Sequence, residues 1–567
     1  MPPYPAHRAR GGALVGAVCA AALVGAWPSS PGVWLEPAER AGLAAAAAAF
    51  GGLTGGLGVR GGLAGAALAG PALLAGIALL PAVGRLWERV APVHALLVVL
   101  AWAAGLWALR GRARPVALVA GAAAVVAAVA RAPDSPRVGR APPGPDLVLL
   151  TLDTTRADHL SAAGGPAPTP ALDAFRASAR WFDAAFSPAV LTGPAHAAAL
   201  SGAEPARLGL RANGQRLGAA LPWVPAELAA AGFETGAFVS AAVLDARLGF
   251  SRGFSAFDAP SDARLVAGHG LLRARGLRHR SGSAFARPGA ETVARALRWW
   301  RHHEGARRFL WVHLYEPHWP YTPDAAAAAA AGLSDATPLG VPSALRGRPW
   351  SAEERARGRA LYAAEVHALD ARVGALLAGV GPGAVVVVAG DHGESLGENG
   401  VDFGHGSDAG APEAWIPLGV RAPALPPGRV AAPVSLRAVA DTLRVSAGLP
   451  AHGPGLLGAF DGPPASPVWT RAFSSGPRGS TLRAVAARQG TGSLVWRASG
   501  PSGGADRGAD PLERALQPAD LGALLPALTA ADGPAPAVDP ALAPALEALG
   551  YREPSASGVS APSSAYR

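Results

Sequence analysis

Residues 145–160, PDLVLLTLDTTRADHL, decide the fold of the longer, C-terminal part of this chain. Residues 146–152 form a short apolar run, which is typical of a strand that is buried on both faces of a parallel sheet. The run ends at Asp153, so a carboxylate stands at the carboxyl end of the predicted strand. Ligands bind at that end of open α/β sheets, which makes Asp153 the first candidate site residue.

Similar apolar runs recur further along the chain, with helical patterns between them. They are TGAFVS, RFLWVHLY and GAVVVVAGD, at residues 235–240, 308–315 and 383–391. The segment 351–380 opens with a capping box, Ser351 to Glu354, and continues with helical periodicity. Strands that alternate with helices predict an α/β domain over residues 146–460, in which helices sandwich a mostly parallel sheet.

The pattern changes after residue 460. Short alternating runs separated by Gly and Pro predict a small antiparallel C-terminal subdomain over residues 461–554, followed by a disordered tail at 555–567.

The first 131 residues are apolar enough to predict a transmembrane helical bundle. Charge-free runs recur at about 11–27, 41–59, 61–84, 93–109 and 115–130, and a membrane-spanning helix needs about 20 apolar residues. Five spans are predicted, with four as the alternative. Six arginines then fall on one side of the membrane: Arg8, Arg10, Arg60, Arg110, Arg112 and Arg114. The positive-inside rule therefore predicts a multi-pass protein of the bacterial inner membrane, whose linker (132–145) leads to an extracytoplasmic catalytic domain.

Composition argues against a nucleic-acid-binding protein and against sites built from cysteines. The formal net charge is +10, yet the basic residues are scattered and no lysine is present, which argues against a nucleic-acid partner. The chain has a single cysteine, so neither an internal disulfide nor a thiolate metal site can form.

Polar residues follow the predicted strands at the edge where ligands bind. Asp391 and His392 come directly after the run at 383–391, and His313, Glu316 and His318 lie at or just past the end of another. Carboxylates with an imidazole predict one divalent ion, among Mg, Ca, Mn and Zn, with Mn or Zn favoured. The alternative reading makes both aspartates helix caps. For His313, packing in the core is the favoured interpretation.

Several motifs together resemble the sulfatase family of the alkaline phosphatase superfamily. In order along residues 145–552 they are LLTLDTTRADHL, TGPAHAAALSG, FLWVHLYEPHWPY, YAAEVHALDARVGALL, GDHGESLGENG with FGHG, and LEALGY. The resemblance implies the superfamily fold and assigns Asp153, Asp391 and His392 to a metal. It implies that His318 contacts the substrate or protonates the leaving group, and that His405 and Asn213 face the substrate. Thr154 stands where many sulfatases have a second aspartate.

Thr192 is the informative departure from the family. Sulfatases place an oxidisable cysteine or serine in C-x-P-x-R, whereas this chain reads Thr192-Gly-Pro-Ala-His196. Threonine cannot give the formylglycine aldehyde, and His196 takes the arginine's place as a substrate-binding residue. The lipoteichoic acid synthase-like and phosphoethanolamine transferase-like members use threonine directly and carry a membrane bundle. The resemblance therefore implies Thr192 as both nucleophile and metal ligand.

The predicted function is a membrane-anchored hydrolase or transferase that cleaves or transfers phosphoester or phosphodiester groups. Its substrate is an ester, with lipid-linked molecules and envelope glycans as the candidates. One alternative is a sulfuric ester hydrolase that works without formylglycine, and another is a catalytically degenerate membrane protein. A second ion held by Glu316, His318 and His405 is also left open. Thr192 as a helix cap is the structural alternative to Thr192 as the nucleophile.

Overall fold

The computed structural model describes residues 143–219, 221–260, 286–339, 349–398, 401–458, 468–476, 479–489, 492–497 and 504–505. The chain divides into two compact units, Met1–Val138 and Gly139–Arg567, and every described residue belongs to the second unit. The predicted membrane bundle, the tail and the LEALGY segment lie outside the described residues. Among the described helices, none combines the length and the apolarity that a membrane crossing requires.

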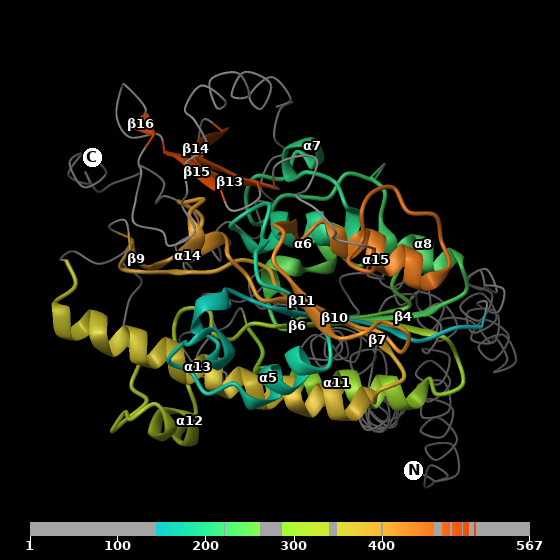
Figure 1. The fold of residues 1–567 in the computed structure, drawn as a ribbon, viewed down its shortest axis with the longest axis horizontal. Helices are drawn as coiled ribbons and strands as arrows, with labels where there is room; N and C mark the ends of the chain where they lie inside the picture. The colour runs from blue at the N-terminus through green and yellow to red at the C-terminus, as the bar shows by residue number, and fades with distance from the viewer. Residues whose placement is uncertain are drawn as a thin grey trace, which may run out of the picture. The chain divides into compact units, whose positions relative to one another are not determined.

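A central sheet of eight strands organises the second unit (Figure 1). In spatial order the strands are β11 (Gly428–Val430), β2 (Arg180–Phe182), β10 (Leu418–Arg421), β7 (Val385–Gly390), β1 (Leu147–Leu152), β6 (Arg308–Leu314), β4 (Glu234–Val239) and β5 (Ala256–Asp258). All neighbours pair in parallel except β10, which runs antiparallel to both β2 and β7. The prediction of a mostly parallel sheet is confirmed.

The apolar runs seen in the sequence form the middle of this sheet. Strand β1 lies between β6 and β7, and every residue of β1 and β7 is buried. Parallel strands covered on both faces need apolar side chains in both directions, which explains runs such as LVLLTL and VVVVAG. Because β1 and β7 are in register, Leu152 pairs with Gly390, and the residues that follow both strands emerge at one edge.

Helices cover both faces of the sheet (Figure 1). On one face lie α6 (Thr192–Ser201), α8 (Val224–Ala230) and α15 (Ala438–Ala447). On the other face lie α5 (Pro170–Ala177), α11 (Gly289–His302), α12 (Ala325–Ala330) and the long α13 (Ala352–Val380). The predicted capping box is present, since Ser351 and Glu354 exchange hydrogen bonds of 3.1 and 2.8 Å at the start of α13. Two short helices, α7 (Pro205–Leu208) and α14 (Ala411–Ala414), lie in the connections.

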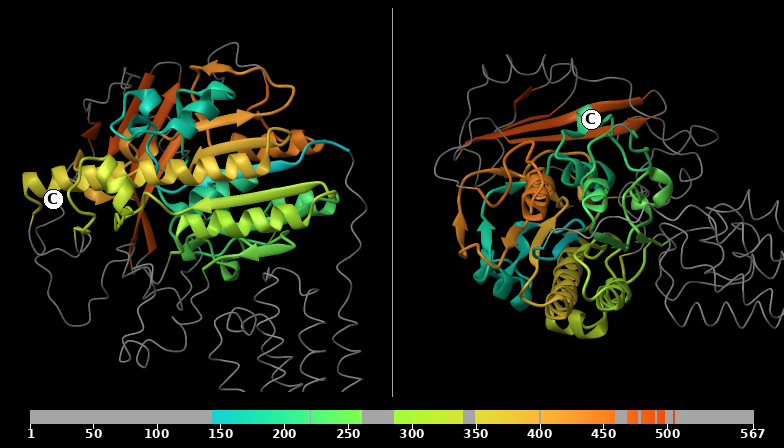
Figure 2. Two further views of the ribbon diagram at one scale, coloured as in Figure 1. Left: turned by 90° about the horizontal axis from the view of Figure 1, so that it is seen from below. Right: turned by 90° about the vertical axis from the view of Figure 1, so that its right-hand side faces the viewer.

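The described residues of this unit also form three smaller sheets. Two are strand pairs, β3 (Ala185–Phe186) with β12 (Val434–Ser435), and β8 (Ser395–Leu396) with β9 (Asp402–Gly404). The third is antiparallel and consists of β13 (Val468–Gly476), β14 (Gly479–Gln489), β15 (Gly492–Arg497) and β16 (Gly504–Ala505). It lies on the same side of the main sheet as α6 and α15 (Figure 2). The predicted C-terminal antiparallel strands are therefore present, whereas the domain boundaries stay predictions.

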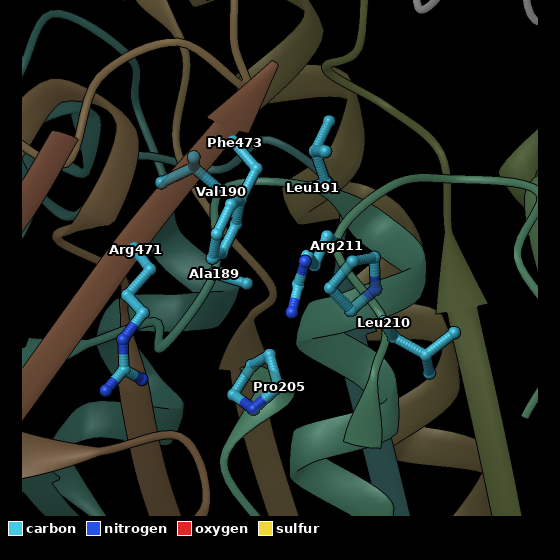
Figure 3. A pocket seen from close by; sticks show the side chains of 9 residues that line it. Ala189, Val190, Leu191, Pro205, Leu210, Arg211, Arg471 and Phe473 are labelled. Atoms are coloured by element: carbon cyan, nitrogen blue, oxygen red, sulfur yellow. The ribbon is translucent and has the colours of Figure 1, made fainter. Parts of the chain in front are cut away.

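Strand β13 is fastened to the loop that leads into α6. The Thr470 hydroxyl donates to the Ser187 carbonyl at 2.6 Å, and the Arg471 N–H donates to the Pro188 carbonyl at 3.1 Å. A small void of about 10 Å³ remains at this seam, bordered by Leu191 and by Phe473 of β13 (Figure 3). A void of this size has room for about one water molecule.

One buried acid on α13 makes the stability of the protein depend on pH. Burial and the nearby carboxylate of Glu316 raise the pKa of Glu365 from its ordinary value of 4.5 to about 8. The folded protein therefore keeps this proton between about pH 5 and pH 8, whereas the unfolded chain releases it. The stability that Glu365 contributes consequently falls as the pH rises through this window.

Replacing Glu365 with glutamine is expected to remove that loss. The amide oxygen can still accept the 2.6 Å hydrogen bond from the Thr322 N–H, and no buried charge forms at high pH. We expect the variant to exceed the parent by about 1 kcal/mol or more at pH 8 and to match it near pH 5. Melting curves at both pH values measure the effect, with the exposed Glu291→Gln as control. An unchanged pH slope would show that the carboxyl group does not carry the effect.

Candidate active site

Three predicted metal ligands meet where β1 and β7 end. Asp153 follows β1, Asp391 and His392 follow β7, and all three side chains are fully buried. The Nε2 atom of His392 lies 3.8 Å from Oδ1 of Asp153 and 3.6 Å from Oδ2 of Asp391. Neither oxygen of Asp153, nor Oδ2 of Asp391, has a hydrogen-bond partner among the described residues. Buried carboxylate oxygens need a compensating partner, so this donor set fits a divalent cation.

The protonation states of these groups also fit a cation. Burial raises the pKa values of Asp153 and Asp391 well above their usual range and lowers that of His392 to about 3. The Nδ1–H of His392 donates to the Gly393 carbonyl at 2.9 Å, which places the lone pair of the neutral ring on Nε2. A bound divalent ion would offset the cost of ionising both carboxylates at this depth.

Thr192 brings a hydroxyl oxygen to the same cluster. It is the first residue of α6, it is fully buried, and its Oγ1 lies 3.3 Å from Nε2 of His392. As the first residue of α6, Thr192 lies at the positive end of the helix dipole. The structure thus places a hydroxyl and a metal-ligand set at one point, as expected for nucleophilic attack on an anionic ester.

His196 lies one helical turn after Thr192, and both of its ring nitrogens are engaged. Its Nδ1–H donates to the Thr192 carbonyl at 2.8 Å, and its Nε2 accepts from the Thr151 hydroxyl at 2.9 Å. These bonds tie the first turn of α6 to β1 and hold Thr192 in place. The predicted substrate contact of His196 stays a prediction.

Asn213 caps the same helix from outside. Its Oδ1 accepts a 2.7 Å hydrogen bond from the Gly193 N–H, and its Nδ2 has no partner among the described residues. The loop is fixed by Gln215, whose side-chain oxygen accepts from the N–H groups of Arg211 and Ala212. A buried amide donor beside the first turn of α6 suits an oxygen of a substrate anion.

His318 and His405 lie beside His392. The centre of the His405 ring is 4.4 Å from that of His392 and 4.9 Å from that of His318. Nδ1–H of His318 donates to the Trp319 carbonyl at 2.5 Å, and its ring stacks on Tyr315. Burial lowers the pKa of His318 to about 4 and that of His405 well below its usual range. Both rings are therefore neutral at pH 7.

Thr154 contributes through its backbone. It has a φ of +48°, which is unusual for a β-branched residue, and its N–H donates to Oδ1 of Asp391 at 3.1 Å. The strained turn therefore helps to hold Oδ1 of Asp391, while Oδ2 faces Nε2 of His392 at 3.6 Å.

Glu316, His318 and His405, left open as a second-ion set, are not among the groups of described residues that have the spacing of metal ligands. Oε1 of Glu316 accepts from the Gly289 N–H at the start of α11 at 2.8 Å and lies 3.4 Å from Nε of Arg372. This carboxylate is thus held by a helix N-terminus and a guanidinium group. Among the described residues, two groups have the spacing of metal ligands: Asp153, Asp391 and His392, and His196, His313 and Asp391.

Two residues near the cluster were not assigned to the site from the sequence. Glu394 is fully buried, and burial with Asp153 nearby raises its pKa well above its usual range. His313, interpreted as a core histidine, has its Nε2 only 3.3 Å from Oδ2 of Asp153. For Glu394 and His313 alike, the only indication in the sequence was that a polar residue lies at or near the carboxyl end of a predicted strand.

Glu413, on α14, organises the loop that carries His405. Its Oε2 accepts hydrogen bonds from three consecutive backbone N–H groups, of Gly406, Ser407 and Asp408, at 2.7, 3.1 and 3.2 Å. Its Oε1 accepts from the Ser395 hydroxyl at 3.0 Å. Gly406 has a φ of +95°, and a Cβ atom there would lie 2.9 Å from the Leu191 side chain. One carboxylate therefore fixes a turn that packs against the residue before Thr192.

Replacing Glu413 with alanine should misplace His405. Alanine has neither oxygen, so the three backbone N–H groups and the Ser395 hydroxyl lose their acceptor. We expect kcat to fall by about tenfold to a hundredfold, since displacements of about 1 Å have effects of that size. Steady-state kinetics measure this, with Glu227→Ala as control, because Glu227 pairs with Arg444 on α15. If the change acts through His405, it should add little to His405→Ala, and fully additive losses would contradict that link.

The comparisons with known proteins agree with this geometry. Residues 145–443, more than half of the chain, match the family model described as Sulfatase. The fold and the comparisons place the protein among the hydrolases of the alkaline phosphatase superfamily. Within it, the chain belongs to the sulfatase family. A comparison with curated proteins found no match.

Solved structures share the fold at low sequence identity. The phosphonate monoester hydrolase of Silicibacter pomeroyi is 19% identical, with a TM-score of 0.51 over 68% of this chain and 94% of its own. The phosphonate monoester hydrolase of Agrobacterium radiobacter is also 19% identical, with a TM-score of 0.50 over the same shares. Ps i-CgsB in complex with k-i-k-neocarrahexaose is 16% identical, with a TM-score of 0.52 over 72% of this chain and 98% of its own. These likenesses support the fold.

Proposed function

We propose that this protein is a membrane-anchored, metal-dependent enzyme that cleaves or transfers phosphoester or phosphodiester groups through Thr192. The observation that carries the proposal is the position of the Thr192 hydroxyl, 3.3 Å from Nε2 of His392, at a helix N-terminus and beside two buried carboxylates. A threonine at this position excludes the formylglycine chemistry of sulfatases, whereas it suits direct nucleophilic attack.

The proposed metal ligands are Asp153, Asp391, His392 and the oxygen of Thr192. When bound, a divalent ion supplies a lowered pKa for the threonine hydroxyl and charge stabilisation for the anionic ester. The mixed oxygen and imidazole donor set favours Mn or Zn.

The residues of this chain account for the rest of the chemistry. The oxygen of Thr192 forms a bond to phosphorus while the bond from phosphorus to the leaving oxygen breaks. The proton lost by Thr192 balances the proton gained by the leaving alcohol. His318 and His405, whose rings lie beside that of His392, are the groups proposed to pass this proton to the leaving oxygen. Asn213 binds an oxygen of the substrate anion, and His196 holds Thr192 and lies close to that anion. Water or an acceptor hydroxyl then takes the phosphoryl group from Thr192.

The substrate is proposed to be lipid-linked or an envelope glycan, acted on outside the inner membrane. Support comes from the sequence, since five apolar runs precede the catalytic unit and their flanking arginines predict its export.

The experiment compares esters directly on the full chain purified in detergent. Nitrophenyl phosphate, bis-nitrophenyl phosphate and nitrophenyl sulfate are assayed after chelation, with Mn, Zn, Mg or Ca added back singly. We expect phosphoester or phosphodiester turnover that returns with Mn or Zn. Turnover of the sulfate ester alone would favour the second candidate, sulfuric ester hydrolysis without formylglycine. The family match is the observation that keeps that candidate open.

A further inference from the structure

His313 faces the metal-ligand cluster from β6, and no role has been assigned to it so far. It is fully buried, and neither of its ring nitrogens has a hydrogen bond among the described residues. Its Nε2 lies 3.3 Å from Oδ2 of Asp153, while Oδ1 of the same carboxylate lies 3.8 Å from Nε2 of His392. The two imidazoles therefore approach the two different oxygens of Asp153.

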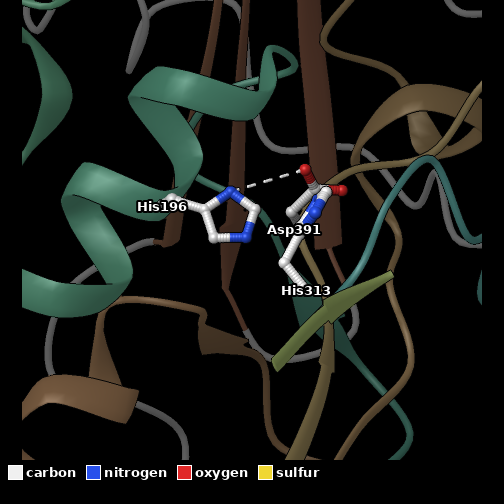
Figure 4. Close-up of side chains that lie close together, drawn as sticks. All are labelled: His196, His313 and Asp391. Carbon is white, nitrogen blue, oxygen red and sulfur yellow. Dashed lines mark ion pairs between the residues drawn. The ribbon is translucent and has the colours of Figure 1, made fainter. Parts of the chain in front are cut away.

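The ring of His313 is held in this position from two sides. In the sheet, His313 pairs with Thr151 of β1, and its carbonyl accepts a 3.0 Å hydrogen bond from the Ser240 N–H. On the face toward α6, its ring meets that of His196 edge to face, with the ring centres 4.9 Å apart. Figure 4 shows His313 next to Asp391, with His196 facing the same carboxylate, and its dashed line marks the 3.6 Å pair between Nδ1 of His196 and Oδ2 of Asp391. The position of Nε2 thus follows from packing.

The spacing of His196, His313 and Asp391 alone would also suit a second metal ion. The hydrogen bonds argue against it, because both nitrogens of His196 are already used by the Thr192 carbonyl and the Thr151 hydroxyl. A second ion would break the contacts that hold the first turn of α6. Without His196, that group keeps two ligands, which is too few for a structural or catalytic site.

We propose that His313 is a positioning residue: its Nε2, which lies 3.3 Å from Oδ2 of Asp153, donates to that oxygen when the ion is bound and keeps Oδ1 turned toward the metal. The inference rests on the metal centre of the proposed function. A carboxylate ligand that is held by a neighbouring donor loses less freedom when the ion binds, and partners of this kind change metal affinity by about 10-fold to 100-fold. Neither oxygen of Asp153 accepts a hydrogen bond from a side chain among the described residues, so Oδ2 is available to the Nε2–H of His313.

The test measures metal binding in the absence of substrate. The full chain is stripped with a chelator and titrated with Mn²⁺, with the ion counted by electron paramagnetic resonance. His313→Leu removes the donor, whereas His313→Gln keeps an N–H near the position of Nε2. We expect one ion per chain in all variants, a dissociation constant raised about 10-fold to 100-fold in His313→Leu, and near-parental affinity in His313→Gln. His303→Leu is the matched control, because His303 bonds to the Trp299 carbonyl on α11.

Several results would overturn the proposal. Parental affinity in His313→Leu would show that the donor is not needed. Two ions in the parent and one in His313→Gln would make His313 a ligand. Should His313→Leu fail to fold in metal-free melting, His313→Asn replaces it, because its shorter amide cannot reach Asp153. Parental affinity in His313→Asn overturns the proposal equally. A wrong substrate class leaves this measurement unchanged, so the two failures are distinguishable.

Discussion

Thr192→Ala is expected to abolish turnover of phosphoesters while leaving the fold intact. The substitution removes the only hydroxyl that lies beside His392 among the described residues, at 3.3 Å, and alanine is well tolerated within a helix. Loss of the nucleophile in a covalent mechanism typically lowers kcat by about 10⁴-fold to 10⁶-fold. Steady-state kinetics on the best ester, together with the melting midpoint, measure the two halves of this expectation.

Thr192→Ser provides the matched control. Serine keeps the hydroxyl and loses a methyl group, so measurable activity should remain. Mass spectrometry after acid quenching should find a phosphoryl group on residue 192 in the parent and on no residue in Thr192→Ala. An alanine variant that retains more than a few per cent of activity would assign the nucleophile to water.

Asp391→Asn is expected to remove the metal and, with it, most of the enzyme activity. Asp391→Asn keeps an oxygen that can accept from the N–H groups of Thr154 and His392, at 3.1 and 2.7 Å in the parent. It removes one of two negative charges from the ligand set, and charged ligands dominate the binding of hard divalent ions. We expect loss of stoichiometric metal after gel filtration and a fall in activity of about 10³-fold or more.

The matched control is another buried aspartate with similar backbone contacts. Asp370, on α13, accepts from the N–H groups of Ala171 and Leu172 at the start of α5, away from the ligand cluster. Asp370→Asn should retain the metal and the activity. Elemental analysis of both variants decides the matter. A full complement of metal in Asp391→Asn would mean that the ion binds elsewhere.

The sequence predicted the parts of the fold where burial is complete. Strands β1, β6 and β7 are apolar on both faces, so each stands out as a continuous run whose end can be placed within about two residues. Strands β2, β5 and β11 have three residues each and leave no periodicity to detect. Their places at and near the edges of the sheet follow from tertiary contacts alone.

The candidate site shows the same division. Asp153, Asp391 and His392 were predictable because they directly follow buried parallel strands. The surroundings of His313 were not, because a strand that is apolar on both faces does not show which side chains point toward α6. The position of Glu316 could not be predicted for a related reason, because its hydrogen-bond partner at the start of α11 is 27 residues away in sequence.

The hydrogen bonds between β13 and the loop at Ser187 and Pro188 limit which sequence changes this enzyme can accept during evolution. The loop runs directly into Thr192, so the C-terminal sheet is a brace for the reactive threonine although it carries none of the site residues. Chimaeras that exchange the C-terminal sheet between relatives would have to bring a matching loop with it. Substitutions in β13 and in this loop are therefore expected to be coupled. Substrate specificity can change more freely in segments that contact neither of them.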